Sequence, residues 1–329
     1  MSKMRSVVLL IIVNAMWATQ VPVIRIIGDK VGPMAIAFIP MIISTIIFIP
    51  FLLVENSRKP AAQRRRWKDL RYFIIPGLIG IFLMQYLYTV GSTKTLASNA
   101  GIITFSIPVL TALFASVLLK EKFNIVRAIG FVFAIGGVLL TSLPDLRGTH
   151  LGGGQYFQGN LIFLLACTCC AFYNTYCKLL VDKQFTKMEI LVYSSIVGSI
   201  ACIPLLIWAE PFHPSTILNG GKVVIGGILE LSFVVYGFSM ILFFHILKSM
   251  DVTQAILGNY LLPFFIAVFG VFLLNEKITM PMIAGSVVII ISTLMVTVYE
   301  NRILAFFHKD KAGVQPPRPY LPTVEEMNK

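Results

Sequence analysis

The chain has 329 residues, of which 57% are hydrophobic and only 13% are charged. Soluble domains carry about 25% charged residues, so this composition excludes an ordinary soluble enzyme or binding domain. The charges are clustered, and the apolar runs between them reach the length of about 20 residues that a helix needs to cross a bilayer. We therefore predict an all-α, polytopic membrane protein. The formal net charge of +12 is interpreted by side of the membrane, and no nucleic-acid partner is expected.

Ten apolar runs predict ten transmembrane helices. In chain order, the runs cover residues 5–26, 34–54, 72–93, 98–119, 125–143, 159–181, 188–208, 222–247, 253–274 and 279–299. The first run follows Lys3 and Arg5, as a signal peptide would. It is interpreted as a helix because no small-residue cleavage site with a polar segment behind it is present. All five cysteines lie in apolar runs, which favours packing over a disulfide framework or a metal site.

Lysine and arginine are distributed unequally between the two sides of the predicted membrane. With both termini in the cytoplasm, 21 of the 27 basic residues lie on the inner side and six on the outer side. This bias predicts a multi-pass protein of the inner or plasma membrane in that orientation. The basic loop Glu55–Arg71 is interpreted as a topology anchor, with binding of anionic lipid as the alternative.

Two distant segments of the chain have the same pattern. Ile107–Gly130 and Leu262–Gly285 each contain a proline-bearing apolar run, then a glutamate and a lysine, then a second apolar run. The two glutamates, Glu121 and Glu276, are 155 residues apart, and so are the prolines. The repeated unit has five predicted helices. Because five is odd, the second copy must enter the membrane from the opposite side, and such inverted repeats are typical of secondary transporters.

The repeat divides the chain into three predicted parts. Residues 1–147 form the first five-helix repeat, 148–300 the inverted second repeat, and 301–329 a polar cytoplasmic tail that is expected to be disordered. The similarity extends beyond one helix pair, because "RIIGDK" (Arg25–Lys30) is echoed by "KLLVDK" (Lys178–Lys183). No part outside the predicted membrane helices is large enough to be a catalytic domain.

These features resemble the drug/metabolite transporter superfamily, of the EamA-like kind. Each half ends in a proline-bearing helix, a short "[KN]EK" loop and a helix with "RAIG" or "MIAG". "NAMWATQVPVIR" is similar to the opening pattern of that family, with Trp17 and Arg25, whereas the second copy has Phe172 where tryptophan is expected. The resemblance covers the chain to about Tyr299. It implies export or exchange of small organic solutes through a central cavity.

Polar side chains inside the predicted helices are candidates for lining a substrate path, because they are costly in hydrocarbon and face the bundle interior. The predicted substrate-binding residues are Asn14, Trp17, Gln20, Gln85, Tyr88, Tyr173, Asn174, Glu230, Asn259 and Tyr260. Amide side chains also hydrogen-bond between helices without any substrate, which is the alternative for each of them. Tyr88 and Tyr173 are deeper than an interfacial aromatic belt predicts.

Glu230 is the only acidic residue well inside a predicted helix. It lies eight residues beyond Lys222, or about 12 Å deep at helical rise. One hypothesis is a site for proton coupling or for a substrate amine. The alternative is a structural carboxyl group that is hydrogen-bonded or paired with a basic residue such as Arg25.

Pro108 and Pro263 are predicted hinges in the fourth and ninth helices. A proline removes one amide donor and frees the carbonyl group four residues back, here at Thr104 and Asn259. Such a bend can present backbone oxygens to a cavity. A packing kink that neighbouring groups satisfy is the alternative.

The expected function is secondary active export or exchange of small organic solutes, such as amino acids or metabolites, by alternating access. The expected partners are the substrate, the lipid bilayer, and a proton or substrate counter-ion. The sequence is compatible with a monomer and with a homodimer. No ATP motif, metal spacing or nucleophile–base set is present, so no enzyme activity, cofactor or metal is expected.

Two alternatives remain at this stage. An antiporter of phosphorylated or nucleotide-linked sugars would need several lysine or arginine side chains in its cavity, and those of this chain lie at predicted helix ends. The second alternative is a membrane scaffold that transports no solute.

Overall fold

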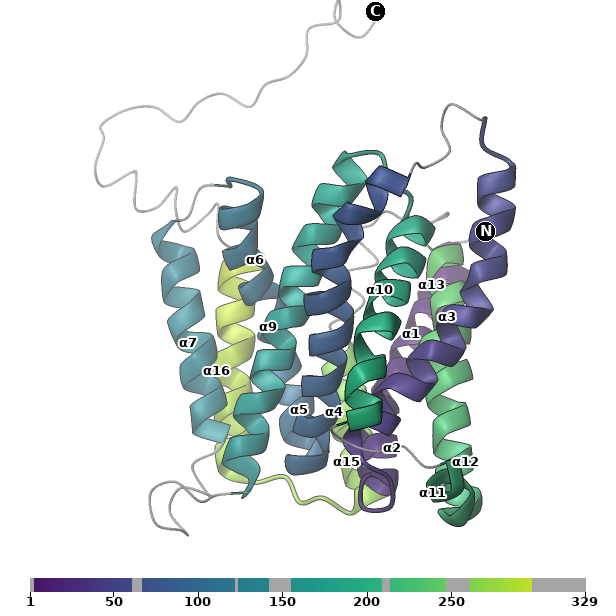
Figure 1. Cartoon of the computed structure of the whole chain (residues 1–329). Coiled ribbons are helices and arrows are strands. Elements are labelled where there is room, and N and C mark those ends of the chain that lie inside the picture. The colour runs from purple at the N-terminus through teal and green to yellow at the C-terminus, as the bar shows by residue number, and fades with distance from the viewer. Residues whose placement is uncertain are drawn as a thin grey trace, which may run out of the picture.

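The structure is a computed structural model that describes residues 3–60, 67–121, 124–141, 155–208, 214–246 and 261–297. These ranges contain helices and turns but no β-strand. Figure 1 shows the helices side by side in one bundle, with the chain running back and forth between its two ends. The all-α, polytopic membrane fold is therefore confirmed.

The first half of the chain makes five crossings of the bundle. They are formed by α1 (Lys3–Ala18) with α2 (Gln20–Gly28), α3 (Pro33–Ser57), η2 (Trp67–Phe73) with η3 (Pro76–Leu83) and α4 (Met84–Lys94), α5 (Ala97–Thr104) with α6 (Ile107–Leu118), and α7 (Ile125–Thr141).

The second half repeats this order. Its elements are α9 (Gln155–Asp182), α10 (Lys187–Trp208), the short α11 (Pro214–Asn219), α12 (Gly221–Leu229) with η4 (Glu230–Phe238) and α13 (Ser239–Ile246), α15 (Leu261–Leu274) and α16 (Met280–Thr297).

By length and composition, six helical stretches within the described ranges are long and apolar enough to cross a membrane. They are Arg5–Gly28, Pro33–Ser57, Ala97–Leu118, Tyr156–Asp182, Lys187–Ile207 and Gly221–Ile246. Three further apolar helices are shorter, namely Ile125–Thr141, Leu261–Leu274 and Met280–Val296. The remaining predicted crossing, 72–93, is helical but divided between η2, η3 and α4.

The third crossing of each half contains a π-helical segment. The first segment, η3, begins at Pro76, and the second, η4, begins at Glu230, which is 154 residues later. A proline cannot donate an amide hydrogen bond, which loosens the helical ladder at the first site. Single π-helical turns inside α-helices are frequent at functional sites. The matched positions make these two crossings the first place to search for a site.

The helices of the two halves pack reciprocally. Equivalent helices meet as pairs, with α7 on α16, α5 on α15 and α3 on α10. The third crossing of each half also packs on the first crossing of the other half. In the first half this contact is α4 on α9, and in the second half it is α13 on α1. The end of α6 lies at the upper end of the bundle in Figure 1, whereas the end of α15 lies at the lower end. The halves are thus inverted relative to each other. The division at residues 147 and 300 falls outside the described ranges and stays a prediction.

Glycine brings α7 and α16 into backbone contact. A Cβ atom placed on Gly285 would lie 2.6 Å from the carbonyl oxygen of Gly137, and one placed on Gly137 would lie 2.9 Å from the carbonyl oxygen of Gly285. Real Cβ atoms do not approach so closely, so only glycine permits this crossing at either position. Small residues of this kind are common where membrane helices pack.

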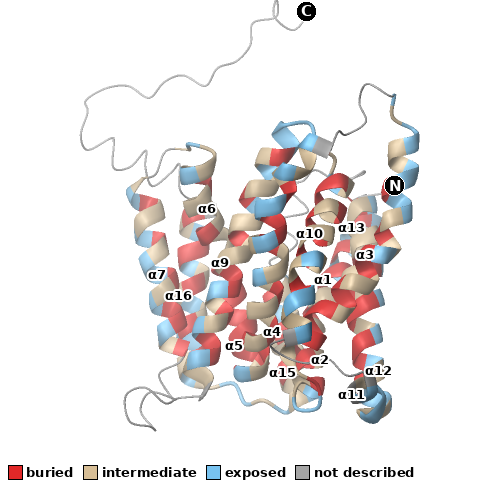
Figure 2. Ribbon diagram, viewed as in Figure 1, coloured by how far each residue is buried: buried red, intermediate tan, exposed pale blue. Residues whose placement is uncertain are grey.

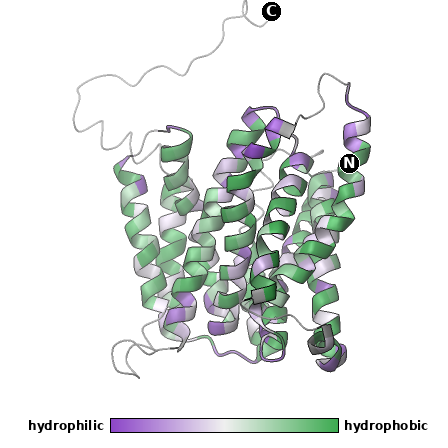
Figure 3. Ribbon diagram, viewed as in Figure 1, coloured by the Kyte–Doolittle hydropathy of each residue, from purple (hydrophilic) through white to green (hydrophobic). Residues whose placement is uncertain are grey.

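The outer surface of the bundle is apolar. Phe272, Val117 and Val132 are 77%, 70% and 68% exposed, and the exposed helix faces in Figure 2 are largely hydrophobic in Figure 3. Monomeric soluble proteins rarely expose large continuous apolar surfaces, and such a surface suits contact with lipid. The exterior therefore agrees with a multi-pass membrane protein.

Candidate functional site

A polar cluster lies where α1 and α2 meet the third crossings of both halves. The first crossing breaks at Thr19, because Pro22 has no amide hydrogen for the carbonyl group of Ala18. The hydroxyl group of Thr19 lies within hydrogen-bond distance of Glu230 Oε1 and is 2.7 Å from the carbonyl oxygen of Met16. The break thus aims a hydroxyl group at the carboxyl group that begins η4.

Tyr236 is the centre of the cluster. Gln20 Nε2 donates a hydrogen bond of 2.6 Å to the Tyr236 hydroxyl oxygen, and Gln85 Nε2 donates a second one to the same atom. Gln20 lies on α2, Gln85 on α4 and Tyr236 on η4. One tyrosine hydroxyl group therefore connects three crossings, two from the first half and one from the second.

Two aromatic residues lie beside this network. The indole N–H of Trp17 donates to Ser239 Oγ at 2.8 Å, and the Trp17 ring centroid is 5.1 Å from that of Phe243. Tyr88 packs against the same apolar cluster as Tyr236, and its ring centroid is 4.7 Å from that of Phe163. Aromatic pairs at these separations are favourable contacts. The cluster is thus lined by ring faces as well as by polar groups.

Glu230 has one oxygen atom without a partner. Glu230 Oε2 is buried and makes no hydrogen bond to any described residue. No ion pair of Glu230 occurs within the described ranges. Arg25, considered above as its partner, instead pairs with Glu276 at 2.5 Å. The structural alternative of a Glu230–Arg25 pair is therefore wrong, and the carboxyl group keeps a free acceptor.

Three of the other predicted residues make contacts outside this cluster. The Asn14 side chain donates to the carbonyl oxygen of Leu10 at 2.8 Å, and its own oxygen is buried without a partner among the described residues. Tyr173 packs on Gly80 of η3. Asn174 is exposed, and its amide is 3.8 Å from the sulfur atom of Cys170. Of the ten predicted residues, Trp17, Gln20, Gln85, Tyr88 and Glu230 come together, whereas Asn259 and Tyr260 lie outside the described residues.

Both predicted hinge prolines lie in the first turn of a helix. Pro108 follows the break between α5 and α6, where the carbonyl oxygen of Phe105 accepts a hydrogen bond of 2.6 Å from Thr293. Pro263 is buried in the first turn of α15, and its carbonyl oxygen lies against Gly101 of α5. Pro263 thus lies where the fourth and ninth crossings meet, whereas the break before Pro108 contacts the tenth crossing. Their hinge role stays a prediction.

Sequence reasoning missed Thr19, Tyr236 and Ser239. Tyr236 is six residues after Glu230, and positions six apart do not share a face of an α-helix. Its partners Gln20 and Gln85 lie on two other helices, so spacing along one helix could not reveal the contact. Thr19 had a readable signal, because it lies next to Gln20 and three residues before Pro22. The π segment had none that periodicity could detect.

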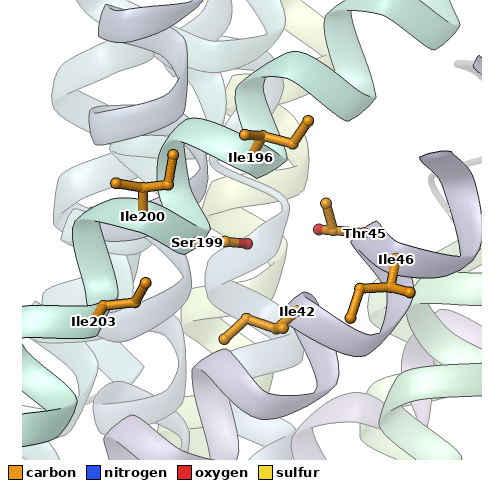
Figure 4. Close-up of a pocket in the computed structure, with 7 residues that line it drawn as sticks. All are labelled: Ile42, Thr45, Ile46, Ile196, Ser199, Ile200 and Ile203. Carbon is orange, nitrogen blue, oxygen red and sulfur yellow. The ribbon is translucent and has the colours of Figure 1, made fainter.

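A separate pocket lies between α3 and α10. Figure 4 shows the side chains that line it, which are Ile42, Thr45, Ile46, Ile196, Ser199, Ile200 and Ile203. Ile46 and Ile200 are each 62% exposed on the outer surface. This lining suits a hydrocarbon chain better than a polar solute, and none of the predicted site residues is part of it. Within the described ranges, no group of three histidine, cysteine or acidic side chains is placed to hold a metal ion.

The sequence is similar to known transporters along its length. The sequence model of the EamA-like transporter family matches it twice, at residues 4–143 and 157–298. An uncharacterized transporter of Archaeoglobus fulgidus is 21% identical over 295 residues, which covers 89% of this chain and 99% of the relative. A protein of Rickettsia felis named as an S-adenosylmethionine uptake transporter is 24% identical over 295 residues, covering 87% and 90%.

The fold is also found among solved structures. One crystal structure, described only as that of a protein, matches with a TM-score of 0.55 and 18% identity. The match covers 92% of this chain and 99% of the other. At this identity the likeness concerns the fold alone.

Proposed function

Because the chain belongs to the EamA-like transporter family, we propose that it is a secondary active transporter that exports or exchanges a small organic solute by alternating access. The observation that carries this proposal is the polar cluster. Gln20 and Gln85 come from the first half, and Tyr236 comes from the second. A site built from both halves changes its access when the two inverted halves exchange conformations. No enzyme activity or cofactor enters the proposal.

Glu230 is the proposed exchange site. An ionised carboxylate without a charged partner is costly in a low-dielectric interior, so the group is either protonated or paired with a cation. Thr19 donates its hydroxyl hydrogen to Glu230 Oε1, and the Oε2 atom is left to bind the proton or to face the cation. A proton and a substrate cation would then alternate at one carboxyl group.

The surroundings of Glu230 define a substrate class. The free Oε2 atom can accept a hydrogen bond or pair with a positive charge, and the rings of Trp17 and Tyr88 provide apolar faces nearby. We propose an amphipathic organic cation or amino acid as substrate. S-adenosylmethionine, which carries a sulfonium cation and an aromatic base, is a first compound to test because a relative is named for its uptake. The absence of Lys or Arg from the described cluster disfavours a sugar-phosphate antiporter.

We propose an inner or plasma membrane location with both termini in the cytoplasm. The support is the excess of basic residues on one side, of which Lys59, Arg127 and Lys178 form ion pairs. The positive-inside rule then places the end of α6 on the cytoplasmic side and the end of α15 on the outer side.

The experiment is solute flux in proteoliposomes with an imposed pH gradient. A thermal-shift screen with S-adenosylmethionine, amines and amino acids first selects a ligand, because ligands that bind the native state raise its melting temperature. We expect Glu230→Gln to abolish accumulation driven by the pH gradient. Asn174→Ala is the control, since Asn174 is exposed and lies outside the cluster. An unchanged rate and pH profile in Glu230→Gln would exclude Glu230 from exchange, and no flux of any selected ligand would oppose transport itself.

A further inference from the structure

Two repeat-related glutamates leave their helices with the same backbone geometry. Lys120 and Asn275, 155 residues apart, adopt positive φ angles of 56° and 52°. The next amide in each case bonds six residues back. Glu121 N donates to Ala115 O at 3.3 Å, and Glu276 N donates to Gly270 O at 3.2 Å. Each helix thus ends at a residue in the left-handed region, as is common at helix C-termini. The "[KN]EK" motif therefore places one glutamate in the same way at each end of the bundle.

Each of these glutamates reaches across to the first helix of the other half. Glu276 of the second half pairs with Arg25 of α2 at 2.5 Å, and Glu121 of the first half pairs with Lys178 of α9 at 3.3 Å. Arg25 and Lys178 open the matching segments "RIIGDK" and "KLLVDK". The same ion pair is thus formed twice, once at each end, and each copy connects the two halves.

The Glu276 pair is tightly held. The Glu276 side chain is only 4% exposed. Its carboxylate also accepts hydrogen bonds from Ala97 N at 2.7 Å, from Ser98 N at 2.8 Å and from Ser98 Oγ at 2.7 Å, at the start of α5. Bonds to an ionised group are stronger than neutral ones, and the positive end of a helix dipole favours a carboxylate. This end of the interface between the halves is closed by a buried group.

The Glu121 pair is loose by comparison. The side chains of Glu121 and Lys178 are 36% and 61% exposed. Glu121 shares its carboxylate with Arg127 of its own half, at 3.2 Å. Exposed ion pairs contribute little, typically below about 1 kcal/mol. Two equivalent contacts are thus in different states within one structure, one buried and one open to solvent.

We propose that Glu276 and Glu121 are alternating latches that close access to the cluster around Tyr236, one from each end. Both ion pairs are formed in this structure, but the Glu276 pair is buried and the Glu121 pair is exposed to solvent. When two inverted halves exchange conformations, each takes the arrangement of the other, so the Glu121 latch becomes buried as the Glu276 latch opens. Both glutamates and their basic partners are positioning residues that do not touch the solute. The inference rests on the alternating-access mechanism proposed above.

The test measures opening at both ends of one molecule without any substrate. Spin labels replace the exposed residues Lys30 and Lys277 near the Glu276 latch, or Lys120 and Lys183 near the Glu121 latch, after the native cysteines have been replaced. Distance distributions are compared for the parent protein, Glu276→Gln and Glu121→Gln. Asp182→Asn is the matched control, because it removes an exposed carboxylate from the same helix end as Lys178.

We expect Glu276→Gln to lengthen the Lys30–Lys277 distance and to shorten the Lys120–Lys183 distance, and Asp182→Asn to change neither. Ser98→Ala removes one donor without the ion pair, so it should give a smaller shift in the same direction if Glu276→Gln does not fold. Identical distributions in parent, Glu276→Gln and Ser98→Ala overturn the proposal, and so does opening at one end with no change at the other. Neither distance measurement depends on solute flux. If the distances shift as expected but no solute is transported, the proposed function is contradicted and the inference about the two ion pairs is not.

Discussion

The indole N–H of Trp17 donates a hydrogen bond of 2.8 Å to the hydroxyl group of Ser239, which lies 222 residues later in the chain. The bond connects the first helix of one half with the third crossing of the other. Because the donor is already used, Trp17 contributes its ring face to the cluster and not its N–H. Its polar role is structural.

The Trp17–Ser239 bond should be measurable as a coupling energy. We expect Trp17→Phe and Ser239→Ala each to destabilise the protein, because a buried hydrogen bond is worth about 1 kcal/mol and an unpaired donor costs more. The double variant should lose less than the sum, with a coupling of about 0.5–1.5 kcal/mol. Denaturant unfolding in detergent provides the four values. Additivity within about 0.3 kcal/mol would show that the two groups are not bonded.

Tyr236→Phe should be the most damaging single change in the polar cluster. It removes one oxygen atom but leaves both Gln20 and Gln85 without their acceptor. An unsatisfied buried donor costs about 1–3 kcal/mol, so we expect a loss of at least 2 kcal/mol together with loss of solute binding.

Tyr86→Phe is the control for Tyr236→Phe. Tyr86 lies next to Gln85 in sequence but packs with the apolar cluster around Phe38. We expect a much smaller change in melting temperature and normal ligand binding. Equal effects of the two variants on stability and binding would mean that the hydroxyl group of Tyr236 is no shared acceptor.

The fold could be predicted from sequence because membrane helices are determined by apolar length and the inverted repeat by a fixed offset. The contacts between residues of different helices could not be predicted. Lipid and protein interior are both apolar, so hydrophobic periodicity does not show which face of a helix is buried. Tyr173 and Asn174 illustrate this. They are neighbours in one predicted cluster, but Tyr173 packs on Gly80 whereas Asn174 is exposed.

Only part of the candidate site could be predicted from the sequence. Glu230 and Gln85 were evident as costly polar groups inside apolar runs. Tyr236 was not, because its partners Gln20 and Gln85 lie on two other helices and the π-helical geometry of η4 is not encoded in the spacing of apolar residues. The "[KN]EK" motif was evident as a repeat, but its contacts with Arg25 and Lys178 depend on how the halves pack.

The Glu121 ion pairs should make stability depend on pH in acid. Burial alone would raise the pKa of Glu121, but hydrogen bonds from Lys178 and Arg127 outweigh it and hold the pKa below its ordinary value of 4.5. A lowered pKa in the folded state means stability that is present above pH 4.5 and is lost as pH falls through the folded value. We expect parent and Glu121→Gln to differ at pH 7 and to converge below that window.

The size of this effect is limited by solvent. Because the Glu121 side chain is 36% exposed, we expect a difference below about 1 kcal/mol that shrinks in high salt. Melting curves at several pH values and two salt concentrations check both features. A difference that persists to the lowest pH would mean that the carboxylate charge is not its cause.

Replacing two neighbouring glycines of α7 by alanine should change the stability of the protein in opposite directions. A Cβ atom at Gly136 would meet nothing within 4 Å, whereas one at Gly137 would lie 2.5 Å from Ile289 Cγ1 and 2.9 Å from the carbonyl oxygen of Gly285. Gly136→Ala therefore gains only the helix preference of alanine, and should stabilise the protein by about 0.5–1 kcal/mol. Gly137→Ala forces α7 and α16 apart and should destabilise it by about 1–3 kcal/mol. Unfolding midpoints of the two variants test the packing directly, because residue type, helix and substitution are the same. If both shift in the same direction, the close α7–α16 crossing at Gly137 and Gly285 is wrong, and with it the reciprocal packing of the fifth and tenth crossings.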